Sequence, residues 1–332
     1  MKCLLLSATL VLFTAGSASA QLDGSFTLRA DEAGRVNLNL QYGDGHSNHG
    51  RTLERAAFSE VTPSGDRITF SLRRAPGSFR FEGRGSMDRA AGFYVFTPNA
   101  DFARDLGGLG FRNIEPRDLC VFALDDLTIA SVKQLKALVS KELDTAELVR
   151  LINHGAGVRF VQSMTDAGFA KLSSDEYRRA RDHGVSAELA REMKALGMPM
   201  SLEELVRTRD HGVTPEYVRA MHAAGFKVGA EELVRARDHG VTADFLRRMQ
   251  SLGYDSLPLD EYVRMRDHGV TPDYVAELRA EGFTELSARD LVRLRDHGIT
   301  ARYVRNAKDA FSGTPTVEQI IRLRNRGGLD PR

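Results

Sequence analysis

The sequence predicts a two-part α+β protein: a small antiparallel β-sandwich or barrel, followed by an α-solenoid of helical hairpins 28–29 residues long. Two observations lead to this fold class. Residues 21–100 alternate apolar and polar positions with a period of two, which is typical of half-buried strands. From residue 101 the period becomes helical, and the motif Arg-Asp-His-Gly recurs at a nearly constant interval. The predicted domains are therefore 21–100 and 101–332.

The β-rich domain is recognised by short alternating runs between turn-rich segments. The run RVNLNLQY places Val36, Leu38 and Leu40 on one face, and RITFSL does the same with Ile68 and Phe70. The segments GDGHSNHG, TPSGDR and RAPGS separate such runs. This pattern predicts five or six antiparallel strands.

The helical part repeats around a series of histidines spaced by 29, 28, 28, 29 and 29 residues. These are His154, His183, His211, His239, His268 and His297. The same step leads forward to Arg326 and back to Asp125, where the motif is degraded. A fixed period of this size predicts stacked helical hairpins with degenerate capping repeats at both ends.

Each unit carries the signals for two helices and two turns. Ser201 and Glu204 have the spacing of a capping box, and Thr214 followed by Pro215 begins the second helix. Gly212 lies where a helix ends in a left-handed residue. We therefore expect a positive φ at the equivalent glycines, which are Gly184, Gly212, Gly240, Gly269 and Gly298.

The repeated histidine has two interpretations. As the last residue of a helix it can meet free carbonyls at the negative helix end. As a metal ligand it would have to converge with other histidines, but stacked helices about 8–10 Å apart hold their side chains in parallel. Helix capping is favoured, and neither metal nor cofactor is predicted. Whether the histidine column senses pH stays open.

The Asp before each histidine is misplaced at a helix C-terminus and should have a cationic partner. An Arg three residues before each Asp, and another one residue before it, suggest an Arg–Asp ladder between units; a solvated face with weak pairs is the alternative. The predicted repeat-edge ladder comprises Arg179, Asp182, His183, Arg207, Asp210, His211, Arg235, Asp238, His239, Arg264, Asp267, His268, Arg293, Asp296 and His297.

One helix position varies between units while its neighbours recur. Variation at a fixed place is what a tailored binding surface shows, although a solvated face shows it too. The candidate partner surface at this position consists of Lys194, His222, Gln250 and Arg279.

The N-terminus has the pattern of a secretory signal peptide. Lys2 precedes an apolar run, and cleavage is predicted after Ala20, which places the protein in a bacterial envelope, either secreted or periplasmic. No transmembrane segment is expected in the mature chain. Loss of Lys2 leaves 45 basic and 45 acidic residues, which argues against nucleic acid as a partner. Cys120 then has no disulfide partner and is expected to be buried and inert.

Catalytic signatures are few, and no catalytic residue is predicted: the sequence has no HExxH helix, GxSxG elbow, phosphate-binding loop or CxxC pair. The 42–51 loop contains Asp44, His46, Asn48 and His49, which could ligate a metal. Its glycines are equally typical of an ordinary hairpin loop, and that interpretation is favoured.

The RDHGVTPEYV-type units, separated by a Gly-Phe pair, resemble tandem repeats of uncharacterised bacterial envelope proteins. They are also similar to repeat extensions of sensor-transducer metallopeptidases linked to β-lactam response. The resemblance covers roughly residues 102–327, and the β-region from GSFTLRA to FTPNADF shares it. A zinc-binding helix and membrane spans are absent here, so the resemblance implies an accessory or recognition role and transfers no catalytic residue.

These observations together predict an exported, non-enzymatic interaction protein that binds a protein or peptide through its helical repeats. The alternative is a small-ligand or glycan binder that works through the β-domain and the 42–51 loop.

Overall fold

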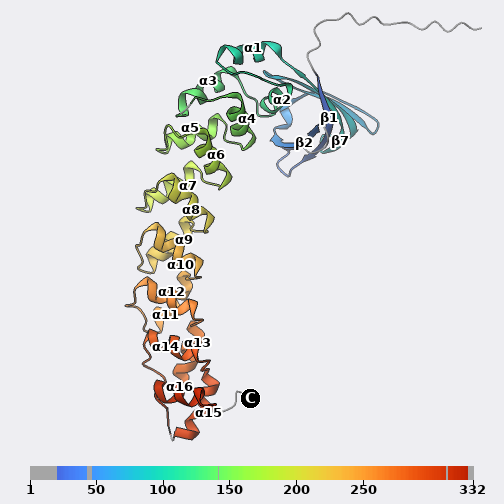
Figure 1. Cartoon of the computed structure of the whole chain (residues 1–332). Coiled ribbons are helices and arrows are strands. Elements are labelled where there is room, and N and C mark those ends of the chain that lie inside the picture. Colours follow the sequence, from blue (N-terminus) through green and yellow to red (C-terminus); the bar gives the residue numbers. More distant parts are fainter. Residues whose placement is uncertain (1–20, 43–46, 141, 312, 328–332) are drawn as a thin grey trace, which may run out of the picture. The chain divides into compact units, whose positions relative to one another are not determined.

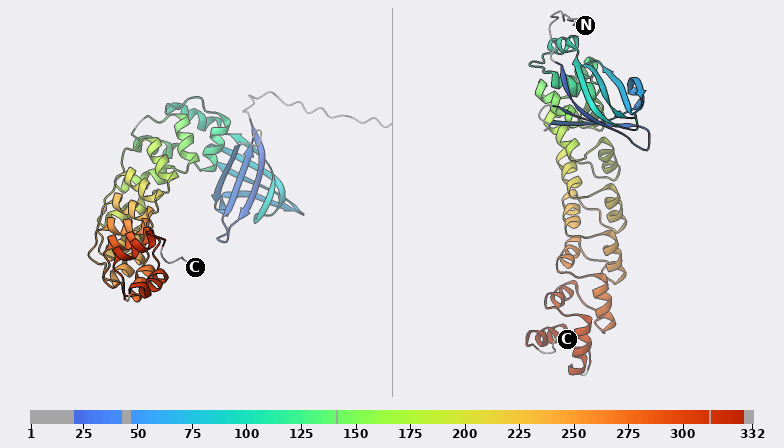
Figure 2. Two further views of the ribbon diagram at one scale, coloured as in Figure 1. Left: turned by 60° about the horizontal axis from the view of Figure 1, so that its bottom comes forward. Right: turned by 90° about the vertical axis from the view of Figure 1, so that its right-hand side faces the viewer.

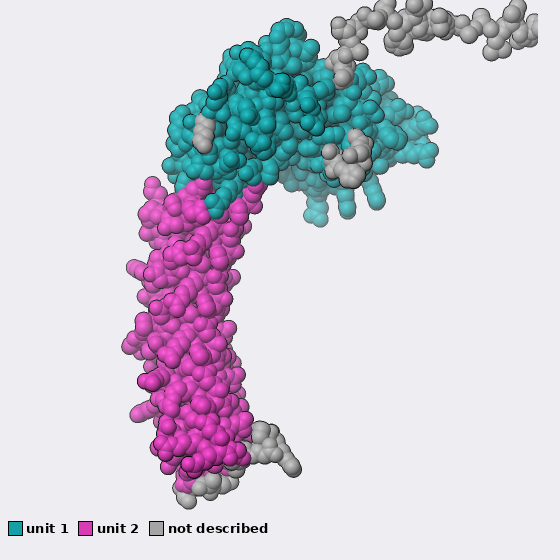
Figure 3. All heavy atoms as spheres, viewed as in Figure 1, with its two compact units in different colours: residues 1–181 teal, residues 182–332 magenta. Residues whose placement is uncertain are grey.

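The computed structural model describes residues 21–42, 47–140, 142–311 and 313–327. In this part of the chain a seven-stranded antiparallel sheet is followed by sixteen helices in tandem, which confirms the predicted α+β fold class (Figure 1). The chain divides into two compact units, residues 1–181 and 182–332, which are coloured separately in Figure 3. The predicted signal peptide, residues 1–20, lies outside the described residues.

The strands form one sheet in the order β3-β2-β1-β7-β6-β5-β4, with every neighbouring pair antiparallel. Two meanders therefore meet where the first strand pairs with the last. The bounds are β1 (Leu22–Ala30), β2 (Val36–Tyr42), β3 (Ser47–Leu53), β4 (Phe58–Ser64), β5 (Arg67–Arg74), β6 (Gly77–Gly85) and β7 (Arg89–Pro98), with a 3-10 turn at Arg55–Ala57.

The strand count is seven where the sequence pattern predicts five or six, and a single sheet takes the place of a sandwich or barrel. The additional strand comes partly from the 42–51 segment, in which β3 pairs His49 with Leu40. The predicted hairpin is confirmed, but its loop is shorter than expected, because the pairing of β3 with β2 extends to Ser47 opposite Tyr42.

A helix, and not a second sheet, covers the apolar face. Phe26, Phe70 and Phe81 lie on this face and pack edge-on or stacked against one another. Helix α2 (Pro116–Leu124) contacts β5, β6 and β7, and its six residues from Leu119 to Leu124 are all buried. Cys120 belongs to this run and is 1% exposed, so its predicted burial is confirmed. Burial raises the pKa of its thiol to about 12, which keeps it protonated and unreactive near neutrality.

The other helices follow in pairs along the chain. Their bounds are α1 (Ala100–Gly108), α3 (Ile129–Leu138), α4 (Thr145–Asn153), α5 (Val158–Asp166), α6 (Ser174–Asp182), α7 (Ala187–Ala195), α8 (Leu202–Asp210), α9 (Pro215–Ala223), α10 (Ala230–Asp238), α11 (Ala243–Ser251), α12 (Leu259–Asp267), α13 (Pro272–Ala280), α14 (Ala288–Asp296), α15 (Ala301–Phe311) and α16 (Val317–Asn325). Among the described residues, none of these helices is both long enough and apolar enough to cross a membrane.

The turns between the helices are built as the repeat pattern predicts. Ser201 and Glu204 form the capping box of α8, and the side chain of Thr214 accepts from the backbone of Tyr217 at the start of α9. Gly212 has φ +69° and closes α8: its backbone N–H donates to the carbonyl of Arg209, and the N–H of Val213 donates to the carbonyl of Thr208. The expectation of positive φ is confirmed at all five positions: Gly184 (+68°), Gly212 (+69°), Gly240 (+71°), Gly269 (+71°) and Gly298 (+64°).

Each degenerate copy of the repeat forms a helix that ends in a left-handed residue, as the other copies do. Helix α16 ends at Arg326 and Gly327, and this glycine has φ +72°. At the other end α2 ends at Asp125, and Asp126 takes the left-handed position with φ +54°. The repeat phase thus extends into the helix that covers the sheet. Its consensus is lost because the sheet buries a surface that water covers in the other copies.

Within residues 182–332 the helices form two parallel layers, visible as two columns in the right-hand view of Figure 2. One layer contains α8, α10, α12, α14 and α16, and the other contains α7, α9, α11, α13 and α15; in each layer a helix contacts its neighbours. Apolar side chains such as Leu205, Val218 and Met221 fill the space between the layers. This is the predicted solenoid of helical hairpins.

Candidate functional site

The repeated histidines form an inter-repeat ladder along one edge of residues 182–332. In each rung the Nδ1 atom of a histidine lies within hydrogen-bond distance of a carboxylate or amide oxygen in the next repeat. The rungs are His183–Asp210 (2.7 Å), His211–Asp238 (2.8 Å), His239–Asp267 (2.5 Å), His268–Asp296 (2.7 Å) and His297–Asn325 (3.0 Å). Each histidine is also the C-cap residue of its helix, as His211 is for α8.

The ladder corrects two expectations about these side chains. The histidine side chains point to the next repeat, whereas capping of the free carbonyls of their own helix was expected. The partner of Asp238 is His211, whereas an Arg–Asp pair was expected. The Asp carboxylate at the end of one helix, such as Asp238 on α10, needs a hydrogen-bond donor from the preceding repeat. The histidine that follows the preceding helix, His211 after α8, lies at that place.

The arginine directly before each Asp stacks on an aromatic ring of the preceding repeat. Its guanidinium lies about 5 Å from the ring centroid, the geometry of a cation–π contact. The pairs are Arg181–Phe160 (5.5 Å), Arg237–Tyr217 (5.2 Å), Arg266–Phe245 (5.2 Å), Arg295–Tyr274 (4.9 Å) and Arg324–Tyr303 (5.1 Å). Leu189 occupies the aromatic position opposite Arg209, so this copy has no ring to stack on.

Three of the other predicted ladder arginines reach an acid in the first turn of the next helix of their layer. Arg207 pairs with Glu231 at 2.8 Å, and Arg235 pairs with Asp260 at 2.9 Å. Arg293 pairs with Glu318 at 2.7 Å. The predicted repeat-edge residues therefore do join neighbouring units, but through His–Asp, Arg–aromatic and Arg–acid contacts.

The variable helix position, occupied by Lys194, His222, Gln250 and Arg279, contributes mainly to contacts between repeats. Gln250 donates from its side-chain amide to the carbonyl of Ala224 at 3.0 Å, and Arg279 donates to the carbonyl of Leu252 at 2.5 Å. Both acceptors are the C-cap residues of helices, so the donors satisfy carbonyls that the helix leaves free. Of the four candidate partner residues, only Lys194 is exposed; His222, Gln250 and Arg279 are half-buried.

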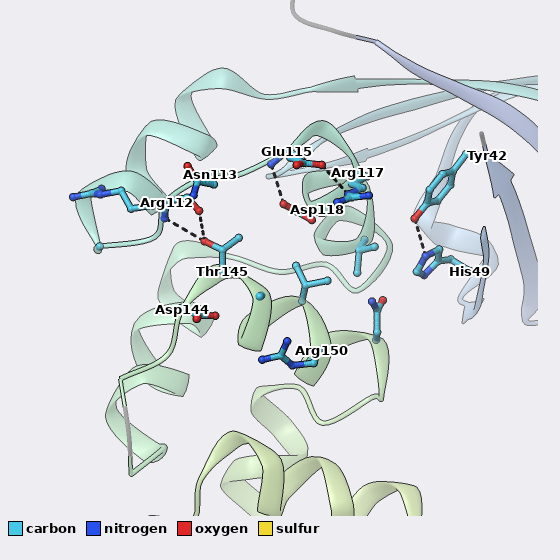
Figure 4. A pocket seen from close by; sticks show the side chains of 15 residues that line it. Tyr42, His49, Arg112, Asn113, Glu115, Arg117, Asp118, Asp144, Thr145 and Arg150 are labelled. Carbon is cyan, nitrogen blue, oxygen red and sulfur yellow. Dashed lines mark hydrogen bonds and ion pairs between the residues drawn. The ribbon is translucent and has the colours of Figure 1, made fainter. Parts of the chain in front are cut away.

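A polar cleft of about 620 Å³ lies in the sheet-containing unit, between the ends of β2 and β3 and the helices α2 and α4 (Figure 4). Tyr42 and His49 form one wall, and Arg112, Asp118 and Arg150 are among the other lining residues. Arg150 has no ion-pair or hydrogen-bond partner among the described residues, so its guanidinium is available to a ligand. The cleft combines acidic and basic side chains with apolar ones such as Val121 and Val149.

Inside the cleft, Tyr42 and His49 form a hydrogen-bonded pair. The Tyr42 hydroxyl lies 2.8 Å from His49 Nε2, and the two rings are parallel with centroids 5.4 Å apart. Burial, followed by the charge of Arg51, lowers the pKa of His49, although a hydrogen bond with the side chain of Asn153 acts in the opposite direction. The imidazole is therefore neutral at neutral pH. Burial also raises the pKa of Asp118.

His49 has a structural role that explains its position. Asn153 stands one helical repeat before Asp182 in the phase of the ladder, and its side chain bonds His49 from the sheet. Nearby, Arg51 bonds Asp125 at 3.1 Å and the carbonyl of Ile152 at 2.7 Å. Strand β3 thus provides His49 and Arg51 as partners for the ends of α2 and α4, a role that side chains of the adjacent repeat have elsewhere in the array. Sequence analysis singled out His49 but missed Asn153, whose only signal was its phase.

Among the described residues, no group of three or more His, Cys, Asp or Glu side chains is arranged to hold a metal ion. Asp44 and His46 of the 42–51 segment lie outside the described residues. Asn48 and His49 lie on β3, and their side chains alternate to opposite faces of the sheet, which separates them.

Comparison with models of protein families and with curated proteins finds no match to this chain.

Proposed function

We propose that this is an exported, non-enzymatic interaction protein whose helical repeat array binds a protein or peptide partner. The observation that carries the proposal is the inter-repeat ladder. Its five side-chain bonds join six successive helix ends, from α6 to α16, so the repeats present one continuous surface. Arrays of this kind bind extended partners because each repeat adds a similar increment of surface. Export rests on the signal-peptide pattern of residues 1–20.

The partner surface is proposed on the charged helix faces that the ladder leaves exposed. A shallow hollow of about 430 Å³ between α8 and α10 belongs to the ladder edge, because Arg207, Asp238 and His239 line it. The proposed surface lies on the other layer, where Lys194 on α7 and Arg247 on α11 are exposed cations near exposed acids such as Asp244. Such a mixed-charge surface suits a polar protein surface or a charged peptide better than an apolar helix.

Site-specific cross-linking tests this proposal. A photoreactive residue at position 194 in the repeat array should give one saturable cross-linked species with envelope extract. The same group at position 93 on the sheet, as a matched exposed position, should not give it. Excess unlabelled protein should compete the species away, and Arg247→Glu should weaken it without changing the melting temperature. Cross-linking at position 93 only would contradict the proposed use of the array.

A second experiment distinguishes a stabilising role of the ladder from a role in partner binding. The double variant His211→Ala with Asp238→Ala is expected to reduce the stability of the array by about 0.5–1 kcal/mol, the scale of exposed charged pairs. Partner capture should persist at a temperature where this variant is folded. Loss of capture in a fully folded variant would show that the ladder edge is the binding surface.

A second candidate function is the binding of a small polar ligand or glycan in the cleft of the sheet-containing unit. The free guanidinium of Arg150, in the cleft that the Tyr42–His49 pair also lines, favours it. A screen of sugars and amino acids by thermal shift would test this candidate, with Arg150→Ala as the variant that should lose any response. A response retained by that variant would place the ligand elsewhere.

A further inference from the structure

Three arginines on adjacent strands project from the polar face of the sheet, opposite the face that α2 covers. They are Arg29 on β1, Arg89 on β7 and Arg84 on β6, and all three are exposed. Their outward direction follows from strand alternation, because Leu28 and Ala90 next to them are buried on the opposite face. β7 lies between β1 and β6, so the three side chains gather at one end of the sheet.

The register brings two of these charges face to face. Arg29 is the cross-strand partner of Arg89, and residues directly opposite on paired strands have Cβ atoms about 4.5–5.5 Å apart. Like charges at such positions are destabilising. Among the described residues neither guanidinium has an ion-pair partner that would relieve the repulsion. Arg84 is less isolated, because its Nε lies 3.6 Å from a carboxylate oxygen of Asp66.

The arginines border a hollow of about 580 Å³ whose polar lining can bind an anion. Thr27, Asn37 and Asn39 also line it. The side-chain oxygen of Asn37 accepts from Thr52 at 2.6 Å, which leaves the amide hydrogens of Asn37 as donors. Ala91, a small side chain on β7 between the arginine rows, leaves room above the sheet. Among the residues that the structure describes, no acidic side chain lines the hollow.

We propose that this hollow is a binding site for a phosphate-type dianion, held by Arg29, Arg89 and Arg84. A dianion between Arg29 and Arg89 converts their repulsion into two charge-assisted interactions, and guanidinium groups match phosphate oxygens two at a time. The amide of Asn37 supplies a neutral donor. The site is separate from the cleft at Tyr42 and from the repeat array, and it depends on neither proposed function.

Calorimetric titration of the purified protein with inorganic phosphate at low ionic strength tests the site directly. Binding should be saturable with one site per chain, and it should weaken as salt is added because the arginines are exposed. Arg89→Gln should lower the affinity by roughly tenfold or more, since charge-assisted hydrogen bonds are lost. Arg80→Gln, an exposed arginine on β6 outside the hollow, serves as the matched control and should bind as the wild type does.

A second readout separates a binding site from an ordinary charged surface. Without phosphate, Arg89→Gln should raise the melting temperature by about 2 °C, because it removes a like-charge pair. With saturating phosphate, the wild type should have the higher melting temperature, because it binds the ligand more tightly. Binding unaffected by Arg89→Gln, or a fall in the melting temperature without phosphate, would overturn the proposal, as would equal loss of affinity in Arg80→Gln.

The phosphate could belong to a soluble ester or to a lipid headgroup, and the two sources can be told apart. Phe93 lies on the same face of β7, four residues after Arg89, and is 75% exposed. Vesicles containing phosphatidic acid, whose phosphate monoester can carry two charges, should be bound in an Arg89-dependent manner if headgroups are the source, and Phe93→Ser should then weaken vesicle binding alone. Binding of glycerol 3-phosphate but not of vesicles would assign the site to a soluble ester.

Discussion

Apolar surface is buried differently in the two parts of the molecule, the sheet with its covering helix and the repeat array. In the sheet, residues far apart in the chain come together: Phe26 packs on Phe70 and Phe81, and α2 is inserted against three strands. In the array, each helix contacts its neighbours in the same layer, and the polar bonds repeat every 27–28 residues, as His211–Asp238 and His239–Asp267 do. One part depends on a single non-local core and the other on a series of similar interfaces.

This difference determines where a substitution should be felt. Loss of a core side chain in the sheet affects one cooperative set of contacts, whereas loss of a repeat contact affects one interface among several.

Truncation of Phe122 on α2 should have the largest effect. Its side chain is fully buried under the sheet, so Phe122→Ala should reduce the free energy of unfolding by about 3–5 kcal/mol. Urea unfolding, followed by a probe in the sheet, measures the loss. Phe93→Ala is the control, since that ring is 75% exposed and its removal should cost less than about 0.5 kcal/mol. Similar losses in both variants would mean that α2 does not complete the core.

Replacement of a turn glycine in the array should have an intermediate effect. Gly212→Ala places a β-carbon on a residue with φ +69°, a conformation that costs an L-residue about 1–2 kcal/mol. The loss should appear in urea unfolding of the array and should be similar for Gly240→Ala. Gly108→Ala at the end of α1 is the control: its φ is not positive and space is open around it, so it should be neutral or slightly stabilising.

Charge reversal at the variable helix position should distinguish its members. Arg279→Glu removes a donor from the carbonyl of Leu252 and brings a negative charge to a helix C-terminus, so a loss of about 1–2 kcal/mol is expected. Lys194→Glu, at the exposed member of the same column, should change stability by less than about 0.5 kcal/mol. Melting curves of the two variants make the comparison. Equal tolerance of both substitutions would restore the interpretation of this column as a solvated binding face.

The smallest expected effect is that of His49, on β3, on the pH dependence of stability. Burial and Arg51 lower the pKa of His49 in the folded protein, so the unfolded state binds its proton more strongly. The contribution of His49 to stability is present above the unfolded pKa of about 6.5 and is lost as the pH falls through the folded value. Between pH 7.5 and 5.5, His49→Gln should therefore show a smaller fall in its urea midpoint than the wild type. His222→Gln, in the other unit, should show the wild-type fall.

The repeat array was largely predictable because its signals are local and are repeated. A cap such as Ser201 with Glu204, and a left-handed glycine such as Gly212, act within a few residues of their positions. Six copies of the same signals remove the ambiguity that a single copy would leave. The helix ends and the turn geometry follow from steric and capping rules that do not require knowledge of the neighbouring repeat.

Side-chain partners across repeats were not predictable in the same way. Periodicity places the Arg, Asp and His columns on one edge, but it does not say which column faces which neighbour. The stacking offset decides that Asp238 meets His211, that Arg237 lies over Tyr217, and that Gln250 reaches the end of the preceding helix. An offset of a few ångströms would exchange these partners, and no local sequence signal encodes it.

The sequence by itself determined the period of the repeats, the conformation of their turns and the change from strands to helices near residue 100, because these depend on interactions between residues close in the chain. Only the tertiary structure decided that α2 covers a single sheet, that His49 meets Asn153, and that Arg29 lies opposite Arg89. Each of these depends on strand register and on packing between distant segments. The free energy of such contacts belongs to the assembled core and not to any one segment.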